Sequence, residues 1–205
     1  MKKTFFQKTY NIISSLLFWG LISFIISFAF NLLVKLFGDF DIPSSDSAII
    51  IIQDKLSLLE NYTSQIATIL MLVAVSLIII ELTQRMISDS ILNYFKSVYQ
   101  TIRLRQFLRQ DEKSESVITI DNQTTVTKFN PILKNFNQSV GKATVDVRKE
   151  SVVVFLKYPR TQQAQKLLRD MEAHIKEEIA SRNPNYYFSS PNRERNKLWF
   201  KATRR

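Results

Sequence analysis

Residues 12–30 read IISSLLFWGLISFIISFAF, and residues 66–80 read IATILMLVAVSLIII. A helix that spans a bilayer needs about 20 consecutive, mostly apolar residues. The first run has that length, and the second reaches it because the residues immediately before it are uncharged. We therefore expect a hairpin of two transmembrane helices, over about residues 12–33 and 62–82. The alternative is that one or both runs are core helices of a soluble protein.

The charges around the two runs predict the orientation of the hairpin. Lysines precede the first run, arginines follow the second, and residues 38–61 between them carry five acidic residues against one lysine. Because basic residues stay on the cytoplasmic side, we expect both chain ends in the cytoplasm and an extracytoplasmic acidic loop over 38–61. The first run is too long for a cleaved signal peptide and ends in no small-residue cleavage pattern.

The residues after the hairpin predict a juxtamembrane helix over 83–110. This stretch contains no glycine or proline, and its apolar residues recur at helical spacing. Arg103, Arg105 and Arg109 gather near its end, and they are candidates for contact with anionic headgroups at the membrane surface. The alternative is a stalk whose apolar face packs on its own domain or on a second copy of the chain.

Residues 111–205 predict a small cytoplasmic domain of the α+β class. The expected order is ββαββαββ, and within it lies βαββαβ, the split-βαβ or ferredoxin-like arrangement. Asn130 and Pro131 are a good cap and first residue for the first helix, which Gly141 closes. The expected strands cover 117–121, 124–129, 143–148, 152–156, 186–189 and 197–203, the second helix covers 161–182, and the final hairpin turns around Pro191 and Asn192.

The residue types needed for catalysis or metal binding are sparse. The chain has no cysteine, so disulfides and thiolate metal sites are excluded, and its three glycines lie too far apart for a phosphate-binding loop. His174 is the only histidine, and its helical neighbours are carboxylates, as is typical of a solvated helix surface. No Gly-x-Ser-x-Gly elbow is present. We therefore expect no enzyme activity, no cofactor and no metal.

The charge of the domain is more informative than its motifs. Residues 111–205 contain 18 Lys and Arg against 11 Asp and Glu. Basic residues interleaved with exposed rings suit single-stranded nucleic acid, whereas basic residues alone also suit an acidic protein partner or lipid. Aromatic residues in a hairpin also commonly fill a core. The candidate binding patch comprises Lys157, Tyr158, Arg160, Tyr187, Arg193, Arg195, Lys197, Trp199, Lys201, Arg204 and Arg205.

Two functions from different classes follow. The first is a non-enzymatic, membrane-anchored adaptor or assembly subunit of a bacterial membrane complex. Polar residues in the first span, such as Ser23, Ser27 and Asn31, allow close contact with other membrane subunits or with a second copy. The second is a membrane-tethered protein that binds single-stranded or double-stranded DNA, for example an accessory subunit of conjugation machinery. The layout of two spans and a cytoplasmic domain is similar in outline to such subunits, although no motif carries the similarity. The Ile-, Asn- and Lys-rich composition suggests a bacterial chain, which places it in the cytoplasmic membrane.

Overall fold

The structure is a computed structural model of a mixed helical and antiparallel-sheet protein. It describes residues 1–38, 47–112 and 130–205, and it describes no side chains for residues 37–38 and 47–49. The chain forms two compact units, which are residues 9–81 and residues 1–8 together with 82–205. We refer to the second unit as the sheet domain.

Two long apolar helices account for the first unit. Helix α1 covers Phe5–Gly38, and helix α2 covers Ser47–Ser88. Both are long and apolar enough to cross a membrane, with a mean hydropathy of 2.2 and 2.5 over their most apolar windows. Because α2 begins at Ser47, most of the segment that we expected in the outer loop is instead a continuous extension of the second apolar helix.

Small residues let α1 and α2 approach each other. Ala67 and Ala74 of α2 are fully buried. A Cβ atom at Gly20 would lie 3.1 Å from the sulfur of Met71, so the missing side chain leaves room for Met71 of the facing helix. Ser27 donates a hydrogen bond to a backbone carbonyl of α2, with an Oγ–O distance of 3.3 Å. This pattern of small and hydroxyl residues is typical of helix pairs in membranes.

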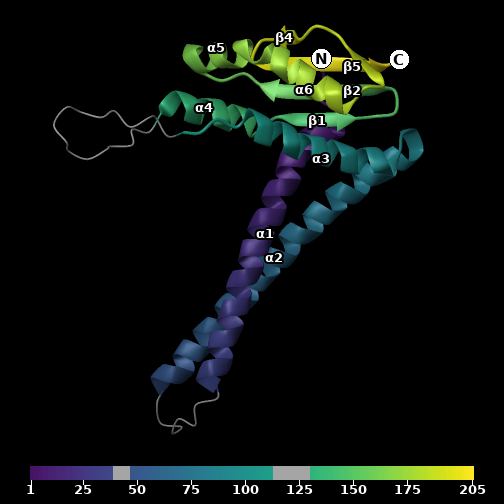
Figure 1. The fold of residues 1–205 in the computed structure, drawn as a ribbon. Coiled ribbons are helices and arrows are strands. Elements are labelled where there is room, and N and C mark those ends of the chain that lie inside the picture. The colour runs from purple at the N-terminus through teal and green to yellow at the C-terminus, as the bar shows by residue number, and fades with distance from the viewer. Residues whose placement is uncertain (39–46, 113–129) are drawn as a thin grey trace, which may run out of the picture. The chain divides into compact units, whose positions relative to one another are not determined.

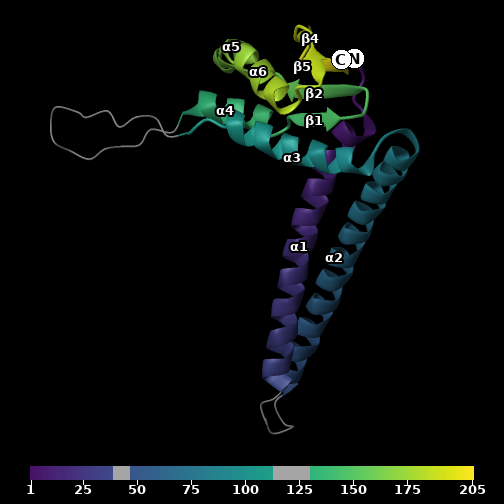
Figure 2. The same cartoon turned by 45° about the vertical axis from the view of Figure 1, so that its right-hand side comes forward.

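The sheet domain is an antiparallel sheet with helices on one face (Figures 1 and 2). The strand order is β1-β2-β5-β3, and β4 also pairs with β5. Alternate residues of β2 and β5, such as Val154 and its neighbour Phe200, form the core with the helices. The strands are β1 Thr144–Val147, β2 Ser151–Lys157, β3 Tyr186–Phe188, β4 Asn192–Glu194 and β5 Lys197–Arg204; the helices are α4 Pro131–Val140, α5 Gln162–Asp170 and α6 Glu172–Arg182.

Helix α4 confirms the predicted helix that begins after Asn130 and ends at Gly141. The side chain of Asn130 accepts hydrogen bonds from the backbone N–H groups of Ile132 and Leu133, at 3.0 and 3.4 Å, and so caps α4. The expected hairpin over 117–121 and 124–129 lies outside the described residues. The ferredoxin-like arrangement is therefore not confirmed, and the described strands have β5, the last strand, beside β2.

Two local predictions for the end of the chain were wrong. The helix expected over 161–182 is divided at Met171 into α5 and α6, and nothing in the structure explains the division. The expected pairing of β3 with β5 is confirmed, but the chain does not turn around Pro191 and Asn192. Residues Asn192–Glu194 form the extra strand β4, and the turn into β5 lies at Arg195 and Asn196. Arg195 has a φ of 52°, in the left-handed region that favours glycine. Because the sequence has no glycine there, it does not signal the turn.

The expected continuous helix over 83–110 is interrupted after Ser88. Helix α3, Ile91–Leu108, begins after a two-residue break. One carboxylate oxygen of Asp89 in the break accepts from Asn93 Nδ2 and from the backbone N–H of Lys149, both at 2.8 Å. Ser90 is extended, with φ −125° and ψ 137°. The side chain of Asp89 thus ties the break both to the start of α3 and to the β1–β2 turn.

Helix α3 covers the open edge of the sheet (Figure 1). Strand β1 is an edge strand, and its free backbone groups bond to side chains spaced four residues apart on α3. Four residues advance a helix by about 6 Å, and two residues advance a strand by about 6.6 Å. Every fourth side chain of α3 therefore meets every second residue along the strand. The contacts are Ser97 Oγ to Val147 N at 2.9 Å, Thr101 Oγ1 to Val145 N at 2.9 Å, and Arg105 Nε to Ala143 O at 2.8 Å. This cover blocks pairing of the edge with another strand.

Replacing Thr101 by valine is expected to destabilise the sheet domain by about 1–3 kcal/mol, because the buried N–H and C=O groups of Val145 lose their partner. Urea unfolding of the detergent-solubilised chain, followed by Trp199 fluorescence in a Trp19→Phe background, measures the change. Thr203→Val removes an exposed hydroxyl and should change stability by less than about 0.5 kcal/mol. Equal effects of the two substitutions would contradict the role of Thr101.

Candidate interaction surface

The face of the sheet opposite the helices is built around two aromatic residues. The register places Phe155 of β2 beside Trp199 of β5, at positions that alternate with the core residues. Their ring centroids lie 5.0 Å apart, and both side chains are buried. Because they point away from the helices, another part of the chain must cover them.

The first residues of the chain supply that cover. The ammonium nitrogen of Lys3 lies 3.7 Å from the centroid of the Phe155 ring. Gln7 Nε2 donates to the carbonyl of Val153 at 3.0 Å, and Phe6 is fully buried. Residues 1–8, which we call the N-terminal segment, thus cross the face of the sheet opposite the helices, which we call the second face. They are an integral part of the sheet domain.

Lysines gather around this covered face. Lys157 lies directly opposite Lys197 in the β2–β5 ladder, an arrangement in which like charges are destabilising. Burial lowers the pKa of Lys3, and the positive charges of Lys197, Lys157 and Lys142 lower it further. We call these four residues the lysine cluster. Within the described residues, none of the four forms an ion pair with a carboxylate.

A small polar pocket adjoins the lysine cluster. Its volume is about 160 Å³, and two of the cluster lysines, Lys142 and Lys157, line it together with Arg160. The remaining lining residues are Asn135, Gln138, Ser139 and Tyr158. The backbone N–H of Arg160 donates to Asn135 Oδ1 at 3.1 Å, which fixes the loop that carries the guanidinium. Three cations with amide and hydroxyl groups, and no acidic lining residue, suit a carboxylate or phosphoryl group.

Two of the three rings in the predicted patch are not available for binding. Trp199 is completely buried, and Tyr158 is buried with the guanidinium of Arg193 lying 4.0 Å from its ring centroid. Tyr187 is 66% exposed. The expectation of several exposed rings among the basic residues is therefore wrong, because Trp199 and Tyr158 are packed inside the domain.

The predicted basic residues are only partly brought together. Lys157, Lys197 and Lys201 share the face that carries Trp199, whereas Arg193 lies opposite Leu198 on the helix side. Arg195 lies in the hairpin turn. Arg204 ends β5, about 23 Å along the strand from Lys197, and Arg205 follows it. Lys3 and Lys142 are not predicted from the sequence as part of the patch, because neither lies in a basic segment of the domain and only the fold brings them to β2.

The predicted membrane-surface arginines also differ in position. Arg105 is turned toward the sheet domain, where two of its nitrogens donate to the carbonyl of Ala143. Arg103 and Arg109 are exposed. Arg103 Nε donates to the hydroxyl of Tyr99 at 3.2 Å. Only these two of the three arginines are free to face a membrane surface.

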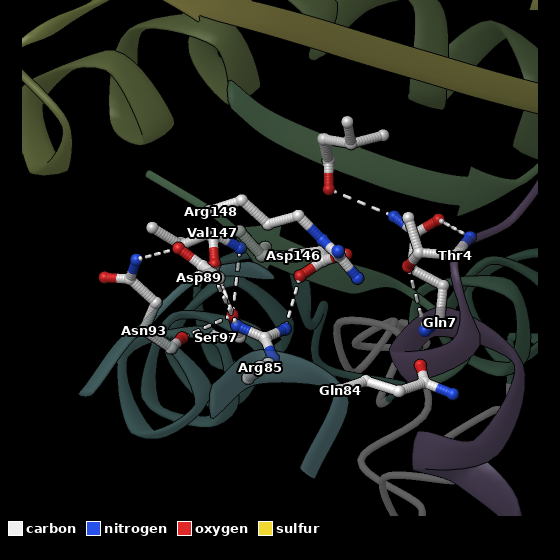
Figure 3. Close-up of polar contacts among 12 residues, drawn as sticks. Thr4, Gln7, Gln84, Arg85, Asp89, Asn93, Ser97, Asp146, Val147 and Arg148 are labelled. Atoms are coloured by element: carbon white, nitrogen blue, oxygen red, sulfur yellow. Dashed lines mark hydrogen bonds and ion pairs between the residues drawn. The ribbon is translucent and has the colours of Figure 1, made fainter. Parts of the chain in front are cut away.

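A buried arginine joins the end of α2 to the sheet domain (Figure 3). Arg85 pairs with Asp146 of β1 at 2.5 Å and with Asp89 at 3.5 Å, and it donates to the carbonyl of Val147 at 3.0 Å. Its guanidinium also lies 5.4 Å from the ring of Phe6. The guanidinium thus contacts the α2–α3 break, strand β1 and the N-terminal segment. We call this arrangement the Arg85 clasp. The sequence alone indicates only that Arg85 is one of the basic residues after the second apolar run.

Comparisons of the chain with protein-family models, curated proteins and solved structures find no match in any of the three. Within the described residues, His, Asp and Glu form no group of three or more that could hold a metal ion.

Proposed function

We propose that this protein is a non-enzymatic adaptor anchored in a bacterial cytoplasmic membrane by α1 and α2, with both chain ends in the cytoplasm. In this role the lysine cluster of the sheet domain binds an acidic segment of a protein partner. The observation that carries the proposal is the direct opposition of Lys157 and Lys197, with Lys3 beside them. The apolar character of the two helices supports the anchor.

The energetics of the lysine cluster favour an anionic partner. Opposed like charges on neighbouring strands destabilise a sheet, so a fold that keeps them gains stability when an anion binds. The pocket beside Lys157 has the size and donors for one carboxylate. An acidic protein segment can fill the pocket and lie along the remaining lysines of the cluster.

The aromatic residues favour a protein partner over single-stranded nucleic acid. Proteins that bind single strands combine cations with exposed rings on which bases stack. Trp199 and Tyr158 are buried, and Tyr187 on β3 is the remaining ring of the patch. Only the basic charge and the single exposed ring of Tyr187 thus support the nucleic-acid alternative. The experiment below distinguishes a nucleic-acid partner from a protein partner.

The test uses the full chain in its native cells, with a photo-cross-linking residue at Gln138, an exposed residue that lines the pocket beside Lys142 and Lys157. We expect one discrete protein adduct there, and we expect it to disappear in the variant Lys142→Glu, Arg160→Glu, Lys197→Glu, because reversing these charges of the cluster and its pocket replaces attraction by repulsion. Gel mobility and mass spectrometry identify the adduct. All three substituted residues are exposed.

The matched control reverses three exposed basic residues elsewhere in the domain: Lys149→Glu, Lys166→Glu, Arg169→Glu. It changes the net charge by the same amount and should retain the adduct. An adduct that nuclease removes would replace the adaptor by the nucleic-acid alternative. An adduct unaffected by the first triple substitution would show that the lysine cluster is not the binding site and would overturn the proposal.

A further inference from the structure

Helix α3 is amphipathic, but its apolar face points away from the sheet domain. The side that contacts β1 is formed by hydroxyl residues such as Ser97 and Thr101, together with Leu104 and Leu108. The opposite side carries an exposed apolar stripe. We define the α3 stripe as Leu92, Phe95, Tyr99 and Ile102, whose exposed fractions run from 45% to 69%.

The spacing of the stripe residues is three or four, so they form one continuous band along the helix. The domain cannot cover this band, because the hydrogen bonds to the β1 edge fix the opposite side of α3 against the sheet. Soluble proteins rarely leave a contiguous apolar band of this kind exposed, and such a band marks an interaction site.

We propose that α3 lies in the plane of the cytoplasmic membrane–water interface, with the α3 stripe inserted among the lipids. The proposal adds a third membrane contact and rests on the proposed anchoring by α1 and α2. In this proposal the α3 stripe is covered by the bilayer surface, and not by a second copy of the chain or by another protein.

Chain continuity favours the bilayer. Two residues, Asp89 and Ser90, separate α3 from α2, a helix apolar and long enough to span. The last apolar run of α2 ends near Leu82, about ten residues before the stripe begins. A helix tied this closely to the end of a span has the membrane interface within reach, at almost no additional entropic cost.

The basic residues around the α3 stripe also favour the bilayer as its occupant. Residues 91–110 contain four basic residues and no acidic residue. Lys96 and Arg103 lie beside the stripe and are exposed, so they can reach anionic headgroups while the apolar side chains enter the acyl boundary. Tyr99 has an apolar ring and a polar hydroxyl, a combination that prefers the interface.

Because the chain contains no cysteine, a single introduced cysteine is a unique site for attaching a spin label. Spin labels are attached to full-length single-cysteine variants in vesicles of phosphatidylcholine and phosphatidylglycerol in equal amounts. Phe95→Cys and Ile102→Cys report the stripe, Ala173→Cys reports an exposed position on α6, and Ile25→Cys reports an exposed position on α1. All four side chains are exposed or half-exposed, so the substitutions leave the packing unchanged. Power saturation then compares collisions with oxygen, which concentrates in lipid, and with a water-soluble nickel complex.

We expect the oxygen-to-nickel collision ratio at Phe95 and Ile102 to be several-fold above that at Ala173, and highest at Ile25. A water-like ratio at the stripe with a lipid-like ratio at Ile25 would overturn the proposal for α3 and leave the anchor intact. A water-like ratio at Ile25 would overturn the anchor as well. Low collision with both reagents, together with spin–spin broadening, would show a second copy on the stripe and would also overturn the proposal.

Discussion

Replacing Arg85 by alanine is expected to lower the free energy of unfolding of the sheet domain by about 3–5 kcal/mol. The substitution removes the buried cation that Asp146 and Asp89 share, and it leaves Asp146 with only the partly exposed Arg148 as a cationic partner. Burying a carboxylate is costly when its buried cation is removed. It also removes the donor to the carbonyl of Val147. Urea unfolding of the detergent-solubilised chain, monitored by Trp199 fluorescence in the Trp19→Phe background, measures the loss.

Arg148 offers the matched control, because it pairs with the same aspartate at 3.1 Å while a third of its side chain remains exposed. Arg148→Ala should cost no more than about 1 kcal/mol. A double-mutant cycle with Arg85→Ala and Asp146→Asn then isolates their coupling. Coupling indistinguishable from zero would show that the Arg85 clasp contributes nothing as a pair.

Loss of the Arg85 clasp should also affect the N-terminal segment. The guanidinium of Arg85 lies against the ring of Phe6, which is fully buried and also packs edge-on against Tyr94 at a centroid distance of 5.8 Å. The same segment places Lys3 over Phe155. Arg85 therefore supports the lysine cluster from a distance, and its loss weakens the cover over the second face of the sheet.

Replacing Trp199 by alanine is expected to destabilise the sheet domain by about 3–5 kcal/mol, because a fully buried indole packed against Phe155 is deleted. Thermal unfolding followed by far-ultraviolet circular dichroism measures the effect without relying on tryptophan fluorescence. The expected result contrasts with the sequence-based hypothesis of a nucleic-acid surface, in which Trp199 would be an exposed platform whose loss weakens binding and spares the fold.

Tyr187→Ala is the control for this substitution, since Tyr187 lies on β3 with most of its ring in solvent. We expect it to change stability by less than about 0.5 kcal/mol. A Trp199→Ala protein with an unchanged unfolding temperature would contradict the buried position of the indole and would return it to the list of binding residues.

Local patterns in the sequence predicted those elements whose formation depends on near neighbours. The apolar runs gave two helices long enough to span a membrane. Asn130, Pro131 and Gly141 placed α4 correctly, because capping is decided within four residues of a helix end. Alternation around Val145 and Val147 predicted β1, and the apolar run over 152–156 predicted β2, both in nearly their observed positions. The turn at Arg195 escaped prediction, because an arginine at positive φ carries no local signal.

The sequence by itself therefore determined the two apolar helices and most of the short elements that follow them. Only the tertiary structure decided which surfaces those elements leave exposed. It buried Trp199 beside Phe155, placed Lys3 from the opposite end of the chain over the Phe155 ring, and brought Lys3 to Lys157 and Lys197. It also turned the hydroxyl side of α3 inward, because the open edge of β1 requires hydrogen-bond partners that an apolar face cannot provide. Such demands arise between segments distant in sequence, so no local pattern records them.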